Sequence, residues 1–380
     1  MKILHTSDWH VGRRIRGRDR SGEHRAVLDE LTRIADEEAV DLTLVAGDLF
    51  DVSSPPPAAE EIVWQALLDL AEVSPVAVVA GNHDNPRRLD AVAPLLAMAG
   101  VTVVGAPRSP EEGGVVELAG AKVALVPFVS QRGIVRAEQI MADDPDRHAA
   151  TYEDRIKAIV GRLTEAMTAD TVNLLVSHLT VHGAVAAGGE RRAHIFGYAV
   201  PAATFPGRLS HVALGHFHSC QQIPHAAPVW YSGSPLQLDF SEAGDRKCAL
   251  LIEASPGLPS KVVEAPLTSG RRLARLRGSL DEVRAAAAEV GNAYVKVELV
   301  EMARVGLADE ARKAFPEHAD VVEVVLRQPG QKRSEPDEPG EPRPAMQPVE
   351  AFGRYLADRG EADPKVEALF AELLDEAGRE

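Results

Sequence analysis

Ile3-Leu4-His5-Thr6-Ser7-Asp8-Trp9-His10 opens the chain with a short apolar run that ends in an aspartate and a histidine. Four later segments repeat this arrangement, because each places metal-ligand residue types directly after an apolar run. These segments are Gly47-Asp48, Gly81-Asn82-His83-Asp84, Ser177-His178 and Gly215-His216-Phe217-His218. In open α/β sheets, the loops at the carboxyl ends of the strands converge and bind ligands. The five segments therefore predict one shared site.

The apolar runs before these segments are short and continuous. They cover residues 41–46, 75–80, 172–176 and 211–214. Continuous apolarity is typical of strands buried on both faces, and enrichment in Val and Ile favours strands over short buried helices. Amphipathic stretches predict helices at about 23–38, 56–72 and 87–98, and hairpin-like patterns predict antiparallel strands within 113–126 and 228–265. The fold class is therefore α/β, with helices packed outside the sheets.

A smaller second module is predicted from residue 267 onward. Ser279 and Glu282 form a capping box before an Ala-rich helix that is expected to end at Gly291. A strand, a helix and a strand are expected to follow at about 293–300, 307–315 and 321–326. These elements indicate a small α+β capping domain over 267–328, beyond a main domain over 1–266.

The last part of the chain differs in composition from the rest. Residues 329–347 form a predicted extended linker that is rich in proline and charged residues. Residues 348–380 then show two short amphipathic patterns, which predict helices. Two such helices cannot fully bury their apolar faces against each other, so a groove on a partner protein is the expected binding surface. Packing against the chain's own body is the alternative.

The composition predicts a soluble protein with a cytoplasmic location. Hydrophobic residues make up 45% of the 380, without a secretory apolar region or a continuous apolar stretch long enough to span a membrane. Two cysteines, Cys220 and Cys248, are too few for a disulfide framework. The net charge of −16 argues against indiscriminate electrostatic binding of nucleic acid. A DNA substrate would therefore have to be held by local basic patches and bound metal ions.

The residue types in the five segments indicate the metal chemistry. Carboxylates, imidazoles and an amide, without thiolates, suit Mn, Fe or Zn better than a structural zinc or a calcium site. The candidate metal ligands are Asp8, His10, Asp48, Asn82, His178, His216 and His218. This set exceeds what one octahedral ion needs, so two ions that share a bridging carboxylate are predicted. Asp48 is the candidate bridge, and Gly47 before it would let the backbone turn sharply.

The five segments in this order resemble the signature of calcineurin-like metallophosphoesterases. The stretch from Ile3 to His10 is similar to the start of the nuclease subunits of bacterial ATP-regulated DNA-processing complexes. Tyr231-Ser232-Gly233-Ser234-Pro235 also resembles a late turn of the superfamily. The resemblance covers essentially the whole chain. It implies two packed mixed β-sheets flanked by helices, a capping domain and C-terminal helices.

The resemblance also implies roles for individual residues. Asp8, His10, Asp48 and His218 would hold the first ion, Asp48, Asn82, His178 and His216 the second, and both ions are expected to be Mn²⁺. His83 matches a histidine that sits over the scissile phosphate, and Asp84 matches the carboxylate that orients it. The expected reaction is attack by a metal-activated hydroxide on a DNA phosphodiester, with His83 assisting the leaving group or the transition state.

Partners follow from the resemblance as well. It implies a DNA exonuclease on duplex ends and an endonuclease on single strands or hairpins. It also implies a homodimer, joined in a heterotetramer by two copies of an ATPase whose coiled-coil base binds residues 348–380. Arg13, Arg14, Arg16 and Arg18 follow the first ligand segment, where they could grip DNA phosphates or form a solvated loop face.

Two other functions are possible, and one residue departs from the pattern of the family. A phosphatase or a small-molecule phosphodiesterase could use the same dimetal site, because the ligands contact only the phosphate; the capping domain and the terminal helices favour DNA. A scaffold with an inactive site is disfavoured, because every ligand position carries a competent residue. Asp51 stands where archaeal relatives carry a histidine, and an ionised carboxylate cannot donate a hydrogen bond to a substrate.

Overall fold

The computed structural model describes residues 1–130, 152–186 and 198–328, together with Phe352, Leu356, Val366, Leu369 and Phe370. The chain forms two compact units, Met1–Gln328 and Pro329–Glu380. The predicted linker 329–347 and most of the predicted helices in 348–380 lie outside the described residues. The five described residues of the second unit are helical, and the rings of Phe352 and Phe370 stack with their centroids 4.1 Å apart.

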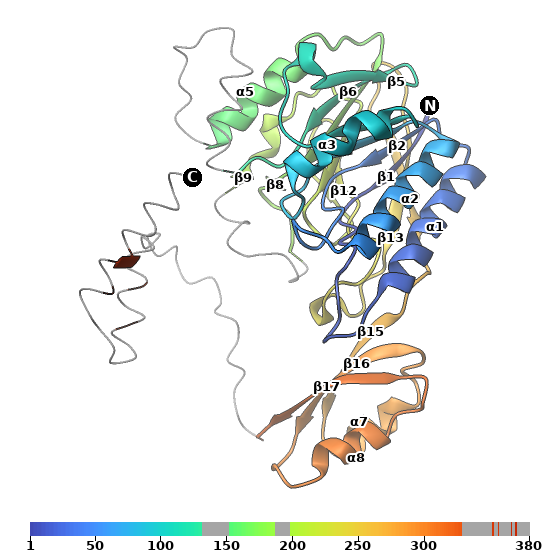
Figure 1. Ribbon diagram of the computed structural model, residues 1–380, viewed down its shortest axis with the longest axis vertical. Helices are drawn as coiled ribbons and strands as arrows, with labels where there is room; N and C mark the ends of the chain where they lie inside the picture. The colour runs from blue at the N-terminus through green and yellow to red at the C-terminus, as the bar shows by residue number, and fades with distance from the viewer. Residues whose placement is uncertain are drawn as a thin grey trace. The chain divides into compact units, whose positions relative to one another are not determined.

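Two six-stranded sheets form the core of the first unit (Figure 1). The first sheet, in the order β14-β13-β1-β2-β3-β4, contains β1 (Lys2–Thr6), β2 (Leu42–Val45), β3 (Val76–Val79), β4 (Val101–Val104), β13 (Cys248–Glu253) and β14 (Lys261–Pro266). The second sheet, in the order β11-β12-β10-β7-β6-β5, contains β5 (Val115–Leu118), β6 (Ala121–Val126), β7 (Val172–His178), β10 (His211–Gly215), β11 (Gln221–Ile223) and β12 (Val229–Tyr231). Both sheets are mixed. The first has antiparallel strands at one edge, β13 and β14, and the second has an antiparallel strand at each edge, β11 and β5.

Alternate side chains of the central strands serve different cores. Ile3 and Leu174 point into the apolar layer between the two sheets. Their chain neighbours Leu4 and Leu175 point to the opposite faces, into the layers under the helices. All four side chains are fully buried. The continuous apolar runs of the sequence therefore reflect strands that bury both faces, as predicted.

Helices cover the outer face of each sheet (Figure 1). The first sheet carries α1 (Ser21–Glu37), α2 (Pro57–Val73) and α3 (Pro86–Ala97), and the second carries α5 (Tyr152–Thr164). The three helices predicted on the first sheet are confirmed, with ends that shift by at most two residues. The helix α5 was not predicted. The resulting α/β/β/α sandwich is the architecture that the sequence led us to expect.

A third sheet lies within residues 272–327 and is wound from β15 (Arg272–Gly278), α7 (Leu280–Ala287), β16 (Ala293–Val300), α8 (Leu307–Lys313) and β17 (Asp320–Arg327). The capping box of Ser279 and Glu282 is present at the start of α7, which ends before Gly291. The strand β15 was not predicted. All three strands are parallel, because a helix lies in each connection and carries the chain back to the same edge.

The remaining elements are short. They are β8 (Thr180–Val181), which pairs with β9 (Ala199–Val200), and the 3-10 helices η1 (Pro110–Glu112), η2 (Ala202–Thr204) and η3 (Phe240–Glu242). The hairpin prediction for 228–265 is confirmed for β13 and β14, whereas β12 pairs in parallel with β10 and belongs to the other sheet. In the part of the chain that the structure describes, no helix is long and apolar enough to cross a membrane.

A buried carboxylate fastens α1 to the segment that leaves the first sheet. Glu30 is 7% exposed and accepts hydrogen bonds from the backbone N–H groups of Thr268 (3.0 Å) and Ser269 (2.8 Å) and from the Thr268 hydroxyl (2.7 Å). Burial acts to raise the pKa of Glu30, but the hydrogen bonds from Ser269 and Thr268 outweigh it and lower the pKa below 4.5. The ionised form of Glu30 therefore stabilises the fold.

The variant Glu30→Gln is expected to lower the free energy of unfolding at pH 7 by about 1–3 kcal/mol, because charge-assisted hydrogen bonds are lost. The folded-state pKa is lowered, so this stabilisation is complete above the unfolded pKa and disappears as the pH falls through the folded value. Urea unfolding at several pH values should show the gap between wild type and variant closing below the ordinary pKa of 4.5. Glu37→Gln, an exposed change on the same helix, is the control. A gap that persists at low pH would contradict this role.

Candidate metal centre

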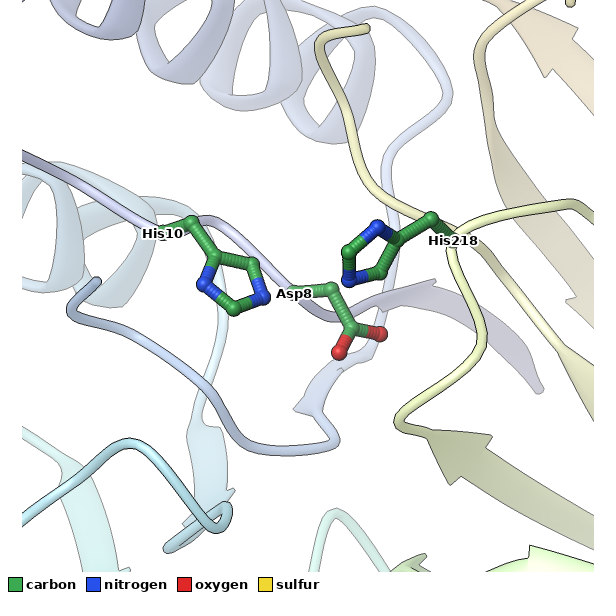
Figure 2. A group of neighbouring side chains, drawn as sticks. All are labelled: Asp8, His10 and His218. Atoms are coloured by element: carbon green, nitrogen blue, oxygen red, sulfur yellow. The ribbon is translucent and has the colours of Figure 1, made fainter. Parts of the chain in front are cut away.

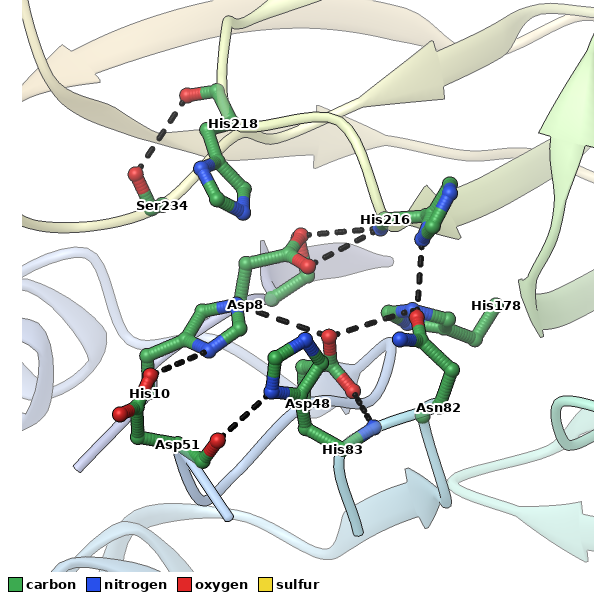
Figure 3. A network of polar contacts seen from close by, with 12 residues as sticks. Asp8, His10, Asp48, Asp51, Asn82, His83, His178, His216, His218 and Ser234 are labelled. Atoms are coloured by element: carbon green, nitrogen blue, oxygen red, sulfur yellow. Dashed lines mark hydrogen bonds and ion pairs between the residues drawn. The ribbon is translucent and has the colours of Figure 1, made fainter. Parts of the chain in front are cut away.

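Loops at the carboxyl ends of parallel strands build the candidate centre. Strands β1, β2 and β3 run parallel in the first sheet, and β7 and β10 run parallel in the second. Their carboxyl ends meet at one edge of the sandwich, as expected for a ligand-binding crevice. Figure 3 shows that this edge brings together all the predicted metal ligands, Asp8, His10, Asp48, Asn82, His178, His216 and His218.

The backbone of the centre is strained at the candidate ligands. Four of them have a positive φ, namely Asp8 (54°), His10 (45°), Asp48 (52°) and His216 (108°). A residue with a side chain is uncommon in this region, and each such conformation costs about 1–3 kcal/mol. The surrounding structure must therefore hold these loops firmly, which is typical of functional sites.

Two glycines let the loops after β2 and β3 approach each other closely. Gly47 has a φ of +86°, and a Cβ atom there would lie 2.6 Å from Nδ1 of His178 and 2.8 Å from the backbone nitrogen of Gly81. A Cβ atom on Gly81 would overlap the carboxylate of Asp48. Only glycine fits at either position, because the colliding atoms belong to the backbone or to buried side chains.

The first ligand group consists of Asp8, His10 and His218, whose side chains turn toward one another in Figure 2. The carboxylate of Asp8 accepts hydrogen bonds from the backbone N–H of His216 (3.0 and 3.1 Å) and from the hydroxyl of Ser7. The ring centroids of His10 and His218 are 5.0 Å apart. One potential ligand atom from each of the three residues lies within 4.8 Å of the others, so one cation could contact all three.

The second ligand group consists of Asp48, Asn82, His178 and His216 (Figure 3). Oδ1 of Asn82 lies 3.0 Å from Nε2 of His178 and 2.9 Å from Nδ1 of His216. On the other side of its ring, Nδ1 of His178 lies 2.9 Å from the carbonyl oxygen of Ala46. A carbonyl can only accept, so Nδ1 of His178 carries the proton and Nε2 presents its lone pair to the centre.

Asp48 joins the two groups. Its Oδ2 lies 3.5 Å from Nε2 of His10 and 3.5 Å from Nε2 of His178. Its Oδ1 accepts a hydrogen bond of 2.8 Å from the backbone N–H of His83, which fixes the orientation of the carboxylate. Asp48 therefore occupies the position that a carboxylate shared by two cations requires.

The protonation states fit a pair of cations. Burial lowers the pKa of both His10 and His178 to about 3, so both rings are neutral at physiological pH. Among the described residues, Nε2 of His10 is buried without a hydrogen-bond partner and faces Oδ2 of Asp48. Each of these neutral rings therefore has one nitrogen lone pair that it can offer to a cation beside the carboxylate of Asp48. Cations bound in this space would satisfy these lone pairs, and the donor set of imidazoles, carboxylates and an amide is one that Mn, Fe and Zn accept.

His83 differs from the other histidines of the centre in its exposure. His10, His178, His216 and His218 are buried, whereas His83 is half-buried at the rim. Its ring lies edge-on to that of His10, with 4.7 Å between the centroids. A histidine in this position can reach a substrate that contacts the ligands below it.

Asp84, which the resemblance assigned to orienting His83, accepts hydrogen bonds from backbone N–H groups. The carboxylate of Asp84 accepts from the backbone N–H groups of Gly81 (2.8 Å), Phe50 (3.1 Å) and Leu49 (3.3 Å), so it clamps two loops together. Burial raises the pKa of Asp84 to about 6. Nδ1 of His83 lies instead 2.6 Å from the carbonyl oxygen of Asp51. The contact that orients the ring of His83 is therefore made by the backbone of Asp51.

The side chain of Asp51 has its own role beside the centre. One carboxylate oxygen lies 3.6 Å from Nδ1 of His10 and 3.2 Å from the guanidinium of Arg13. Burial acts to raise the pKa of Asp51, but the contacts with His10 and Arg13 lower it to about 2. Asp51 therefore orients the ring of His10, a function that its sequence position did not reveal.

A buried charge network behind His218 was not predicted from the sequence. Glu242, in η3, is fully buried and lies with Oε1 2.9 Å from Nδ1 of His218, while its Oε2 accepts from Nζ of Lys247 (2.7 Å). Lys247 also donates to the carbonyl oxygen of His218 (2.9 Å). Burial acts to raise the pKa of Glu242, but His218 and Lys247 lower it to about 2. No motif links these residues to His218, because the chain brings them together only by folding.

The basic segment after the first ligand loop is engaged within the chain. Arg16 pairs with Glu323 (2.7 Å) and Arg18 with Asp320 (2.8 Å), both on β17. Two further contacts are those of Arg13 with Asp51 and of Arg14 with the carbonyl oxygen of Gly17. Arg16 and Arg18 therefore fasten the segment to the third sheet (β15, β16 and β17), which lies in the predicted capping domain and is named the capping sheet for that reason.

An α/β/β/α sandwich with carboxylates and imidazoles at the ends of its parallel strands is the arrangement of a two-metal phosphoesterase. Residues 1–220 match the family described as calcineurin-like phosphoesterase. Three similar proteins are named as the SbcD component of the nuclease SbcCD: those of Bacillus subtilis strain 168 (36% identity, 73% of each chain), Rhodobacter capsulatus (35%, 70% of this chain and 69% of the relative) and Escherichia coli K12 (32%, 75% and 73%). The chain therefore belongs to the calcineurin-like phosphoesterases, and within them to the SbcD proteins.

Replacement of Glu242 by Gln is expected to weaken Mn²⁺ binding about 10–100-fold, the usual effect of altering the outer partner of a ligand histidine, here the candidate ligand His218. Gln can still accept from Nδ1 of His218, but it cannot balance the charge of Lys247. Calorimetric titration with Mn²⁺ measures the effect, and circular dichroism checks the fold. Glu117→Gln, an exposed change on β5, serves as the control. Unchanged affinity in a folded Glu242→Gln variant would rule out the role.

Proposed function

We propose that the chain is the metal-dependent nuclease subunit of an SbcCD-type complex that processes DNA. The observation that carries this proposal is the position of Asp48, whose Oδ2 lies at equal distances from the lone pairs of His10 and His178. A carboxylate so placed suits a pair of cations, and the SbcD relatives named above are nucleases. The activity would include exonuclease cleavage at duplex ends and endonuclease cleavage of single strands or hairpins.

The proposed ligand assignment follows the two groups of the centre. The first ion would be held by Asp8, His10, Asp48 and His218, and the second by Asp48, Asn82, His178 and His216. Mn²⁺ is the proposed metal, since imidazole, carboxylate and amide ligands suit it. When bound, two such ions supply charge neutralisation at a phosphodiester and a nucleophile derived from water. Asn82 and His83 are half-buried, whereas the candidate ligands other than Asn82 are buried, so we expect a substrate to approach from the side of these two residues.

His83 is proposed as the catalytic histidine at that rim. Its Nδ1 faces the carbonyl oxygen of Asp51, which can only accept, so Nδ1 keeps a proton and the orientation of the ring is fixed. Nε2 is then the atom that can carry a second proton toward the leaving oxygen or stabilise the charge on the phosphate. Asp84 supports this step by holding the backbone around Gly81, Leu49 and Phe50.

Fewer arginines are available for DNA than the sequence indicated. Arg16 and Arg18 are already paired with acidic residues of the capping sheet, so DNA phosphates would have to compete with Glu323 and Asp320. These pairs are partly exposed, and such ion pairs contribute little to stability. Arg14 is exposed, and among the described residues its guanidinium donates to a carbonyl oxygen and pairs with no carboxylate, so of the four arginines it is the one most available to a phosphate.

We base the proposed complex with an ATPase on the name of the relatives and on the predicted helices in residues 348–380. Residues 348–380 would bind the coiled-coil base of an SbcC ATPase, and two copies of each chain would form a heterotetramer around a homodimer. Val366 and Leu369 support this, because they are helical yet 41% and 54% exposed. The proposed location is the cytoplasm, as the composition of the chain predicts.

A phosphatase or a small-molecule phosphodiesterase remains the alternative that shares the same site. We therefore propose digestion of end-labelled duplex and hairpin DNA with Mn²⁺, with and without the ATPase, beside a phosphate monoester as the control substrate. DNA should be cut and the monoester left intact. Hydrolysis of the monoester without cleavage of DNA would favour the alternative.

His83→Gln should reduce the rate of DNA cleavage about 10²–10⁴-fold, because a general acid is lost. Its Mn²⁺ content should stay at the wild-type level, since His83 is not among the proposed ligands. Asp48→Asn should instead lose Mn²⁺, which elemental analysis of the dialysed protein measures. Full activity of His83→Gln would disprove the role of His83 without affecting the assignment of the ligands.

Leu369→Glu should abolish co-purification with the ATPase, because a charge would enter the proposed apolar interface. The side chain of Leu369 is exposed, so the change should not affect folding of the chain. Val305→Glu, at a fully exposed apolar position next to α8, is the matched control and should bind as wild type does. Undiminished co-purification of Leu369→Glu and of a chain lacking 348–380 would refute the assignment.

A further inference from the structure

The two cysteines of the chain meet in the folded protein. Cys220 lies in the connection between β10 and β11, and Cys248 is the first residue of β13. The carboxylate of Glu264, on β14, joins them, and the two sulfur atoms and one of its oxygens all lie within 4.8 Å of one another. Three segments far apart in the sequence therefore bring three potential metal ligands to one point.

The register of the β13–β14 hairpin explains why Glu264 faces the thiols. Glu264 lies opposite Leu250 in the antiparallel ladder, and Leu250 is two residues from Cys248. Residues two apart in a strand, and residues directly opposite across a ladder, point to the same face of the sheet. The carboxylate of Glu264 and the thiol of Cys248 therefore lie on one face of the hairpin.

The cluster is buried on the side of Cys248 and open to solvent on the side of Glu264. Cys248 is 6% exposed and belongs to the apolar layer between the two sheets. Cys220 is half-buried, and Glu264 is exposed. A cation could enter from the side of Glu264, and a water molecule could complete its coordination there.

The donor set differs in kind from that of the dimetal centre. Two sulfurs and a carboxylate are ligands that a thiophilic divalent ion such as Zn²⁺ prefers, whereas the proposed dimetal ligands include no sulfur. Three protein ligands and an open position make a tetrahedral site. We infer that Cys220, Cys248 and Glu264 form a second metal site, specific for thiophilic divalent cations and separate from the dimetal centre.

The third donor distinguishes this inference from a redox pair. A disulfide needs only the two sulfurs, and a carboxylate beside it would add negative charge without a bonding role. A divalent cation uses all three groups, and each thiol releases its proton to solvent when its sulfur binds. The convergence of Glu264 on the thiols therefore favours a metal.

The proposed site is joined to the dimetal centre through the backbone. Cys220 follows His218 by two residues, and Cys248 follows Lys247, which donates to the carbonyl oxygen of His218. Gly233 packs tightly on the same connection, since a Cβ atom there would lie 2.6 Å from that carbonyl oxygen and 2.8 Å from the nitrogen of Cys220. A cation bound by the thiols would hold this connection and so restrain the position of His218.

The test measures the absorption that arises when a thiolate sulfur binds Co²⁺. The reduced full-length protein, first loaded with Mn²⁺, is titrated with Co²⁺ and followed by near-ultraviolet absorption. Sulfur-to-cobalt charge transfer can arise only from Cys220 and Cys248, which are the only cysteines of the chain. Saturation at one Co²⁺ per chain is expected. The readout does not depend on nuclease activity, so its failure would leave the proposed function untouched.

Three variants make the test specific. Cys220→Ser should abolish the charge-transfer absorption, and its half-buried position makes the change mild for folding. Glu264→Gln should weaken Co²⁺ binding more than about tenfold. The reason is that a direct ligand is lost, and even a residue that only supports a ligand costs about that much. Glu253→Gln, an exposed change near the far end of the same hairpin, should leave binding unchanged. Thermal unfolding followed by circular dichroism confirms that each variant is folded.

Several outcomes would overturn the inference. Absence of the absorption in the reduced wild type would do so, as would its survival in Cys220→Ser. Unchanged affinity in Glu264→Gln would remove the third ligand and with it the site as assigned. Oxidation of both thiols by a low-molecular-weight disulfide, in a protein that binds no Co²⁺ when reduced, would identify a redox pair instead.

Discussion

The carboxylate of Asp48 lies where two sheets and their loops meet, and the arrangement of the first unit can be understood from what holds it there. The parallel strands direct their carboxyl ends to one edge, and the loops after β2 and β3 then come into backbone contact. Gly47 and Gly81 permit that contact because neither has a side chain in the way. Asp84 closes it by accepting backbone hydrogen bonds from both loops. The left-handed backbone of Asp48 itself persists because its surroundings leave no alternative.

A second layer of polar groups orients the imidazoles of the centre. Four of the five imidazoles of the centre face an acceptor, which is a backbone carbonyl for His178 and His83 and a carboxylate for His218 and His10. For the candidate ligands His10, His178 and His218, a proton held on the outer nitrogen leaves the inner nitrogen for a cation. Burial keeps His10 and His178 neutral, and neutral imidazole is the form that binds metal.

The capping sheet is tied to the main sandwich by charged side chains. Arg16 and Arg18 reach β17 from the loop that follows the first ligands, and Glu30 of α1 holds the segment that enters β15. The arginines that the sequence offered for DNA are therefore partly used within the chain. The chain as a whole carries a net charge of −16. In the proposed function, attraction of DNA would therefore depend on cations in the dimetal centre more than on this segment.

The sequence by itself predicted doubly buried strands with helices outside and the polar residues that meet at the ends of these strands, because continuous apolar runs report strands buried on both faces and the carboxyl ends of parallel strands lie at one edge. It could not determine the outer partners of the imidazoles. Glu242 and Lys247 reach His218, and Asp51 rather than Asp84 contacts the ring of His83, only through loop conformations that leave no periodic signal. The meeting of Cys220, Cys248 and Glu264 was likewise decided by tertiary structure, since strand register and loop packing brought the three together.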